Sequence, residues 1–253
     1  MGAALVAGLL SGRWATPQEL LVVEPVAARR KELSAAHPGL RVAAEVAPGA
    51  EAAVVAVKPG DVEAACRALA AAGVDRVLSI AAGVTLARLE SWLNPGAAVV
   101  RAMPNTPALV GCGAAAIAGG DGASEADLAW AEEILSAVGR VERVGEPLLD
   151  AVTGLSGSGP AYVFLVAEAL VEAGVAVGLP RAVSETLTIQ TLLGSARLLA
   201  ESGERAEALR AAVTSPGGTT AAGLAALESR AVRAAFMDAV VAATKRSKEL
   251  GQA

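Results

Sequence analysis

A cluster of hydroxyl-bearing and small residues near the C-terminus has the residue types that best suit chemistry. It reads Val213-Thr214-Ser215-Pro216-Gly217-Gly218-Thr219-Thr220, within a region that is otherwise alanine-rich and helical in pattern. Pro216 ends a preceding helix, the two glycines let backbone N–H groups approach a ligand, and the threonines begin a new helix. Such a turn can bind a small anion at the helix N-terminus. Taken alone, it is equally well explained as a helix-to-helix connection with a threonine N-cap.

The composition restricts the class of protein. The chain has 253 residues, of which 54% are apolar but only 2% aromatic, and its formal net charge is −5. This length suits two domains, and a core built from Ala, Val and Leu favours an α-rich protein. Charges are scattered without a basic run, which argues against a nucleic-acid partner. The distant Cys66 and Cys112 and the single His37 offer neither a disulfide framework nor a metal site, and they suit a reducing cytoplasm.

The most apolar stretch, residues 161–179, does not have the pattern of a membrane span. Glu168 and Glu172 interrupt it and lie four residues apart on one helical face. The amino end lacks the basic flank and uninterrupted apolar core of a signal peptide. We therefore expect no membrane association and a cytoplasmic protein.

Alternating strand and helix patterns fill the first half of the chain. Short apolar runs lie at residues 20–23, 53–57, 76–80 and 98–101, separated by segments with helical spacing. The alternation predicts parallel βαβ units whose strands are covered on both faces, with ligands at the carboxyl ends of the strands. Two further runs, 115–118 and 141–144, flank a helix that starts at Ser124, with Asp127 completing a variant of the capping box.

From about Glu146 the strand patterns stop, and the rest of the chain is predicted to be helical. The expected helices span residues 147–152, 160–177, 181–202, 204–213, 220–228 and 231–250. We therefore predict an α/β domain at 1–145 followed by an all-α domain at 146–253. Small residues at 194–196 could pack against another subunit or within one chain.

The amino end departs from a dinucleotide-binding fold. Residues 1–10 have the pattern of a helix, and no strand with a Gly-x-Gly turn precedes them. In such folds that strand is central in the sheet, and its turn holds the pyrophosphate. Only Gly2 could be the last glycine of the turn. We expect an unfilled central sheet position and weakened cofactor binding, arising either from a start-site error or truncated chain, or from a shortened, inactive relative.

Five segments, in order along the chain, closely resemble pyrroline-5-carboxylate reductase, the enzyme of the last step of proline synthesis. They are Ala56-Val57-Lys58-Pro59, Ser79-Ile80-Ala81-Ala82-Gly83-Val84, Val100-Arg101-Ala102-Met103-Pro104-Asn105-Thr106-Pro107, the segment from Asp150 to Tyr162, and the segment from Thr214 to Thr220. The resemblance covers essentially the whole chain. It implies a Rossmann-like dinucleotide-binding domain at 1–145 and a helical substrate-binding and dimerisation domain at 146–253. It also implies homodimers that often assemble into larger rings, and NADPH, or alternatively NADH, as the cofactor that reduces a small imine to an amino acid.

The resemblance assigns the cofactor to the ends of the predicted strands. It implies that Ala56, Val57, Lys58, Pro59, Ala81 and Ala82 line the nicotinamide and ribose, with Gly2 in the phosphate turn and Asn105 facing cofactor or substrate. From the residues alone, Lys58 would be a solvated charge at a strand end and Asn105 an ordinary turn residue.

The residues leave the choice between the two nicotinamide cofactors open. Glu24, at the end of the first strand, suits the ribose 2′-hydroxyl of NADH, whereas Arg29 and Arg30 could meet the 2′-phosphate of NADPH.

The family's substrate is a cyclic imine with a carboxylate, and it receives hydride at the C=N carbon. The resemblance aligns Thr220 with the threonine that hydrogen-bonds the substrate nitrogen, which makes Thr220 the predicted catalytic residue. The amides of Gly217, Gly218 and Thr219 are predicted to bind the carboxylate, and Ser215 is a further predicted substrate-binding residue. Glu146 matches an acidic position beside cofactor and substrate, although a surface carboxylate at a helix start is also ordinary. Ala211 stands where the family often has aspartate.

Other functions must be weighed against this one. The first is a non-catalytic oligomer, or pseudoenzyme, whose nucleotide domain binds poorly. A weaker alternative is a reductase of a different imine or hydroxy acid. The joint presence of Thr220, Asn105 and Lys58 favours the enzyme.

Overall fold

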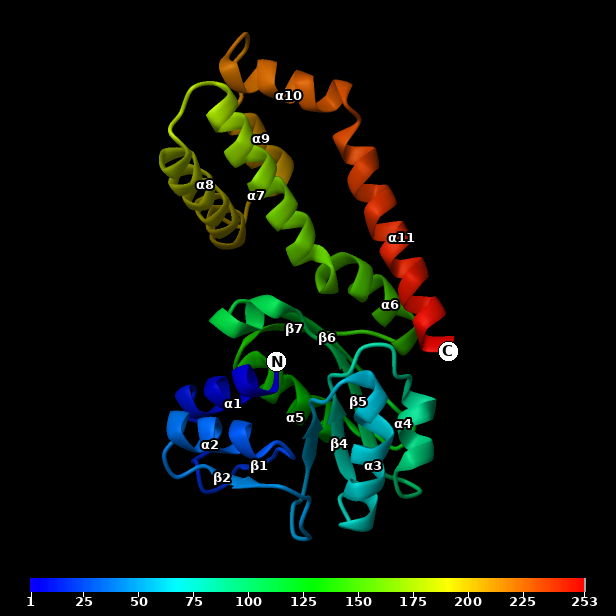
Figure 1. Ribbon diagram of the computed structural model, residues 1–253. Coiled ribbons are helices and arrows are strands. Elements are labelled where there is room, and N and C mark those ends of the chain that lie inside the picture. Colours follow the sequence, from blue (N-terminus) through cyan, green and yellow to red (C-terminus); the bar gives the residue numbers. More distant parts are fainter. Residues whose placement is uncertain (253) are drawn as a thin grey trace. The chain divides into compact units, whose positions relative to one another are not determined.

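The computed structural model describes residues 1–252, and the chain folds into two compact units (Figure 1). Unit 1 comprises residues 1–158 together with the end of the last helix from Val241 onward, and unit 2 comprises residues 159–240. Residues just beyond the predicted boundary at 145 belong to unit 1, because Leu149 is fully buried in its core and Asp150 accepts a 2.6 Å hydrogen bond from the Ser247 hydroxyl. The functional boundary at 145/146 stays a prediction.

Unit 1 is an α/β structure, which confirms the predicted Rossmann-like class. Its main sheet contains, in spatial order, β3 (Ala53–Val55), β4 (Arg76–Ser79), β5 (Ala98–Met103), β6 (Gly113–Gly119) and β7 (Gly139–Arg143). All neighbours are parallel except β5 and β6. A separate parallel pair consists of β1 (Leu21–Val23) and β2 (Arg41–Ala43). The predicted strands are confirmed, and β2 is an additional one.

The division into two sheets lies where the sequence leads us to expect an unfilled strand position. Among residues 1–252, β1 pairs with β2 alone and β3 pairs with β4 alone. In a continuous Rossmann sheet, a further strand would lie between β1 and β3. In the described part of the chain, no strand pairs with the free edge of β1 or with the free edge of β3.

Helices cover both faces of the main sheet, and each face has its own core. The helices of this unit are α1 (Gly2–Ser11), α2 (Ala27–Ala36), α3 (Val62–Ala71), α4 (Leu86–Trp92), α5 (Glu125–Ser136) and the short α6 (Leu149–Val152). Successive strand residues alternate between the cores: Val77 and Val99 pack with α3 and α4, while Leu78 and Val100 pack with α1 and α5. The capping box expected at the start of α5 is confirmed, with hydrogen bonds in both directions between Ser124 and Asp127.

Unit 2 is entirely helical, as predicted. It contains α7 (Gly159–Ala176), α8 (Arg181–Glu201), α9 (Ala206–Ala212), α10 (Thr219–Ser229) and the first part of α11 (Val232–Gln252). The helices α7 and α8 approach closely at small residues: the Ser184 hydroxyl donates to the Val171 carbonyl at 2.8 Å, and a Cβ on Gly174 would overlap the Ser184 hydroxyl. Ser184 and Thr188 are the buried residues of this unit, and neither is apolar.

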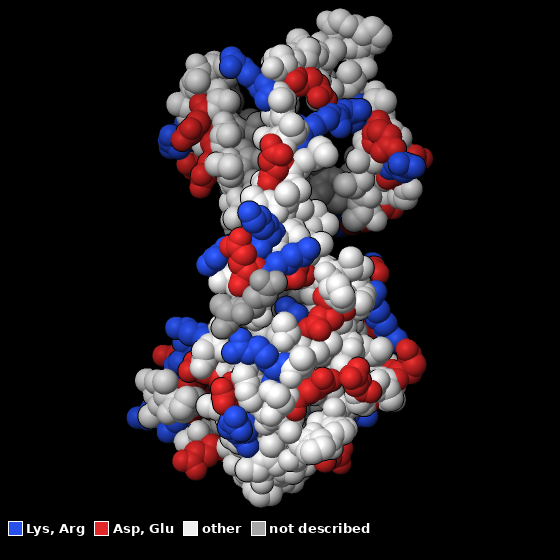
Figure 2. Space-filling model, turned by 90° about the vertical axis from the view of Figure 1, so that its right-hand side faces the viewer, with Lys and Arg blue, Asp and Glu red and all other residues white. Residues whose placement is uncertain are grey.

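Exposed apolar side chains are therefore the main feature of the surface of unit 2. Phe164 is 62% exposed and Ile189 is 63% exposed. By length and composition alone, the segment Glu146–Ala176 is apolar enough to cross a membrane, and it carries the acidic residues Glu168 and Glu172. On the face drawn in Figure 2, acidic and basic residues are interspersed rather than gathered into one patch.

Candidate functional site

The residues predicted to hold the nicotinamide lie at one edge of the main sheet. Residues 56–59 directly follow β3 and are exposed, and Ala81 and Ala82 follow β4, with Ala81 buried and Ala82 exposed. The two strands are parallel and in register, with Val55 opposite Ser79. The carboxyl ends of neighbouring parallel strands therefore bring these two segments together, as ligand sites in open α/β sheets require.

The start of α1 lies at the same edge. A Cβ added to Gly2 would approach the Cβ of Ala56 to 3.2 Å, so the first turn of this ten-residue helix adjoins the segment after β3. Within residues 1–252, no side chain caps the helix, so its first N–H groups remain available to an acceptor. A phosphate group fits such a helix start, and the small residues around it leave the backbone accessible.

Asn105 connects three segments of unit 1. Its side-chain N–H donates to the Ser156 carbonyl at 3.0 Å, and its side-chain oxygen accepts from the Ala114 amide at 2.9 Å. Asn105 thereby holds the turn after β5, the start of β6 and the π-helical turn Thr153–Gly157 in fixed relation. This positioning role is visible in the structure, while contact with cofactor or substrate stays a prediction.

Glu146 has two hydrogen-bond partners on its Oε1 atom. It accepts from the guanidinium of Arg101 at 2.8 Å and from the backbone N–H of Leu86 at 2.7 Å. Arg101 is 7% exposed and lies within β5, so its charge needs a buried partner. Leu86 is the first residue of α4, directly after the loop that carries Ala81 and Ala82. Glu146 therefore holds the C-terminal end of that loop by accepting a hydrogen bond from the first residue of α4. Its ligand role stays a prediction.

Arg101, the partner of the predicted site residue Glu146, is not singled out by sequence reasoning. It is a charged residue inside an otherwise apolar strand, Ala98–Met103. That contrast is the signal that could have found it, because a charge in a strand covered on both faces requires a partner.

The Thr-Ser-Pro-Gly-Gly-Thr-Thr segment of unit 2 connects α9 to α10. Gly217 has φ +70°, a left-handed conformation that favours glycine, and a Cβ on Gly218 would overlap the Ser215 hydroxyl. The N-cap of α10 is Gly218, which offers no side chain to the first turn. Thr219 and Thr220 are exposed, and their amide N–H groups have no acceptor among residues 1–252. This helix start can therefore receive an anion.

One detail of the predicted carboxylate site changes. The N–H of Gly218 donates to the Ser215 carbonyl at 3.1 Å, which closes the turn. Because the Gly218 N–H already has an acceptor, the N–H groups of Thr219 and Thr220 are better candidates to donate hydrogen bonds to a bound carboxylate.

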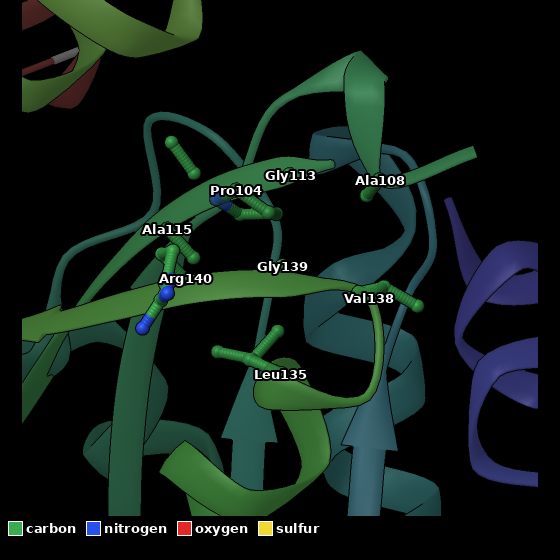
Figure 3. Close-up of a pocket in the computed structure, with 9 residues that line it drawn as sticks. Pro104, Ala108, Gly113, Ala115, Leu135, Val138, Gly139 and Arg140 are labelled. Atoms are coloured by element: carbon green, nitrogen blue, oxygen red, sulfur yellow. The ribbon is translucent and has the colours of Figure 1, made fainter. Parts of the chain in front are cut away.

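Unit 1 also contains a small pocket and a buried cysteine. A small pocket beneath the start of β6 and β7 is lined mostly by apolar or glycine residues, including Pro104, Gly113 and Leu135 (Figure 3). It includes none of the predicted site residues. Burial raises the pKa of the Cys66 thiol to about 11, so this cysteine stays protonated at neutral pH and is a core residue rather than a nucleophile.

The α/β unit followed by a helical unit is typical of dinucleotide-dependent oxidoreductases with an appended helical domain. The family model for pyrroline-5-carboxylate reductase dimerisation matches residues 146–250. Pyrroline-5-carboxylate reductase from Synechocystis is 46% identical over 257 residues, which cover 100% of this chain and 95% of that protein. The chain belongs to the pyrroline-5-carboxylate reductase family, a family of oxidoreductases.

Solved structures agree with this assignment. The pyrroline-5-carboxylate reductase from Coxiella burnetii has a TM-score of 0.92 and 37% identity, over 98% of this chain and 93% of that one. Pyrroline carboxylate reductase from Plasmodium falciparum, solved with NADP bound, has a TM-score of 0.85 and 30% identity, over 99% of this chain and 94% of that one. The match to a dimerisation domain also accounts for the apolar surface of unit 2.

Proposed function

We propose that this protein reduces 1-pyrroline-5-carboxylate to L-proline, the last step of proline biosynthesis, in the cytoplasm. The observation that carries the proposal is the uncapped start of α10 in a chain of this family, with an exposed hydroxyl and two unengaged amides side by side among the described residues. A small imine that bears a carboxylate needs both kinds of group.

The substrate is held by the segment from Ser215 to Thr220. The amides at the start of α10 bind the carboxylate, supported by the Ser215 hydroxyl, and the left-handed Gly217 keeps the backbone close to the ligand. Thr220 hydrogen-bonds the imine nitrogen, which becomes an amine as the reaction proceeds. No strong base is needed, because the imine can arrive protonated.

The cofactor is held by the edge of the main sheet. The segment Ala56–Pro59, the pair Ala81–Ala82 and Asn105 surround its nicotinamide and ribose, and Gly2 adjoins its phosphates. When bound, the nicotinamide supplies the hydride. An NADP-bound relative supports a pyridine nucleotide. The family resemblance implies NADPH, with NADH as the alternative.

The helical region forms the subunit contact. We propose a homodimer through residues 146–253, with dimers assembling into larger rings. The dimerisation-family match and the exposed apolar residues of α7 and α8 support this arrangement.

A non-catalytic oligomer is the alternative function. The observation that favours it is the division of the nucleotide-binding unit into two sheets, since a Rossmann sheet is normally continuous at the cofactor site. The alternative predicts assembly without turnover.

The test is turnover of pyrroline-5-carboxylate by the purified protein, followed by the oxidation of NADPH or NADH. The Thr220→Ala variant should lower kcat by about 10- to 1000-fold, the range for loss of one transition-state hydrogen bond. Thr219→Ala is the matched control, because it removes the neighbouring hydroxyl and keeps the amide. Absence of turnover with both nucleotides would support the pseudoenzyme, and a normal rate in Thr220→Ala would refute the assignment of Thr220.

A further inference from the structure

A carboxylate stands at the carboxyl end of β1, the strand that leads toward the adenosine side of a dinucleotide site. Glu24 directly follows Val23, and its backbone N–H still donates to the Ala43 carbonyl of β2 at 2.9 Å. In dinucleotide-binding sheets, an acidic residue at such a strand end hydrogen-bonds the ribose hydroxyls of NAD. By this rule, Glu24 corresponds to the position where the two nicotinamide cofactors differ, which is the 2′ position of the adenosine ribose.

The Glu24 carboxylate is fixed in place by the turn that it begins. Its Oε1 accepts the backbone N–H of Val26 at 2.9 Å, and its side chain is only 22% exposed. A carboxylate has about four lone-pair positions, so this bond leaves acceptor capacity for a ribose hydroxyl. Because the backbone holds it, the carboxylate has little freedom to swing away from an incoming phosphate.

The nearest arginine in the turn is already engaged. The Arg30 guanidinium donates from Nη1 to the carbonyls of Glu24 at 2.8 Å and Pro25 at 2.7 Å. These bonds tie α2 to the end of β1, and releasing them would leave two carbonyls without their donor. Arg30 therefore stabilises the turn and is not free to bind a 2′-phosphate without losing these two hydrogen bonds.

The second arginine is a weaker candidate for phosphate binding. Arg29 is 66% exposed, and its Nε lies 3.7 Å from Oε2 of Glu24. A solvated pair at this distance contributes little energy and is screened by salt. Arg29 can offset the negative charge of Glu24, but the pair carries no net positive charge that would attract a phosphate.

We propose that Glu24 makes this protein select NADH over NADPH. The proposal rests on the proposed function, and it chooses between the two cofactors that the sequence leaves open. The carboxylate accepts a hydrogen bond from the 2′-hydroxyl of NADH, whereas it faces the 2′-phosphate of NADPH as a like charge.

The test measures binding of each reduced nucleotide to the full chain by calorimetry, without substrate. NADH should bind at least about tenfold more tightly than NADPH, the size expected for one like-charge contact near a surface. Glu24→Gln keeps an oxygen for the Val26 N–H and removes the charge, so it should reduce the NADH preference by about tenfold. Added salt should reduce the preference of the wild-type protein as well.

Two further variants make the result specific. Arg30→Ala loosens the turn and should weaken both nucleotides by a similar factor, with the preference kept. Arg29→Glu adds a second carboxylate at an exposed position and should weaken NADPH more than NADH if the 2′ position lies at this turn, even where Glu24→Gln does not fold. Equal weakening of both nucleotides would place the 2′ position elsewhere and overturn the role of Glu24.

Each outcome has a definite meaning. Equal or tighter binding of NADPH, or an unchanged preference in Glu24→Gln, would overturn the role of Glu24 and leave the proposed reduction intact. Failure of both nucleotides to bind would overturn the proposed function, and this inference with it.

Discussion

The two units of this protein are stabilised in different ways. Unit 1 has an apolar core on each face of its main sheet, with Val77, Leu78, Val99 and Val100 completely buried. Unit 2, residues 159–240, buries no apolar residue by itself, although its helices carry many exposed large ones. Its closest internal packing is made at small and polar residues such as Gly174 and Ser184.

This difference shows that apolar side chains can serve two purposes, either to form a core within one chain or to form a contact with another chain. In unit 1 the helices of one chain cover both apolar faces of the main sheet. In unit 2 the long helices expose apolar side chains, and we propose that a second copy covers them, as expected for a dimerisation domain. Unit 1 should therefore fold independently of concentration, whereas unit 2 should depend on assembly.

The largest effect should come from a charge placed on the exposed face of α7. In the Phe164→Asp variant the dimer dissociation constant should rise by at least about 100-fold, because an aromatic anchor at an interface typically contributes ~2–4 kcal/mol and each dimer contains two copies. Sedimentation velocity over a range of concentrations measures this change.

A matched substitution in unit 1 separates assembly from general surface effects. Leu109 is 66% exposed, close to the value for Phe164, and lies in the short turn Thr106–Val110. Leu109→Asp should leave the dissociation constant unchanged within about threefold, as surface substitutions usually do. Equal dissociation constants for Phe164→Asp and the wild-type protein would contradict the assignment of α7 to the dimer contact.

The next effect concerns the buried charge of unit 1. Glu146→Ala leaves Arg101 without its carboxylate and the Leu86 N–H without its acceptor. We expect the free energy of unfolding to fall by about 2–4 kcal/mol, somewhat below the usual cost of breaking a fully buried pair, because the Glu146 side chain is 29% exposed. Chemical denaturation measures it, and Glu142→Ala, at an exposed position in β7, is the control.

The same variant distinguishes positioning from direct substrate binding. If Glu146 acts by holding the start of α4, then stability and the KM for the nucleotide should change together. Normal stability with a large loss of kcat would instead indicate direct contact with the substrate.

Much of the fold could be predicted because its local patterns agree with its packing. The apolar runs at β3, β4 and β5 are bounded by turn residues, and Ser124 with Asp127 marks the start of α5. The strand β2 escapes prediction because Arg41-Val42-Ala43 contains a single strong β-former. The antiparallel direction of β6 follows from its short connection to β5, which is too short for a crossover helix.

The candidate site was harder to predict, because its supports join residues far apart in the sequence. The partners of Asn105 include Ser156, and those of Glu146 include Leu86, which no local pattern relates. Sequence indicates which residue types stand at strand ends, but only the fold decides whether an amide or carboxylate is already occupied. For this reason Glu146 and Asn105 have visible positioning roles, while their predicted ligand roles remain open.

The smallest effect should come from a change in the capping box of α5. It tests whether the ionic interactions of unit 1 contribute to stability independently of subunit assembly. Hydrogen bonds from Ser124 hold the pKa of Asp127 below its usual value, and Arg76, whose Nε lies 2.6 Å from Oδ1, adds to this. A lowered pKa means that the unfolded chain takes up the proton first as pH falls. The stabilisation is thus complete above the unfolded pKa of about 3.9 and is lost as pH falls through the folded pKa.

Asp127→Asn should therefore cost only about 1 kcal/mol of stability at neutral pH, because Asn keeps an acceptor oxygen for the Ser124 N–H and the released Arg76 side chain is 39% exposed to water. This difference should shrink below pH ~3.9. Urea denaturation at several pH values and protein concentrations measures it. Glu125, two residues before Asp127, is an exposed carboxylate that pairs with Arg143 at 2.7 Å. The control variant Glu125→Gln should therefore change the free energy of unfolding by no more than about 0.5 kcal/mol. Because Asp127 and its partners all belong to unit 1, its effect should not vary with protein concentration; a concentration-dependent loss would mean that unit 1, like unit 2, relies on assembly.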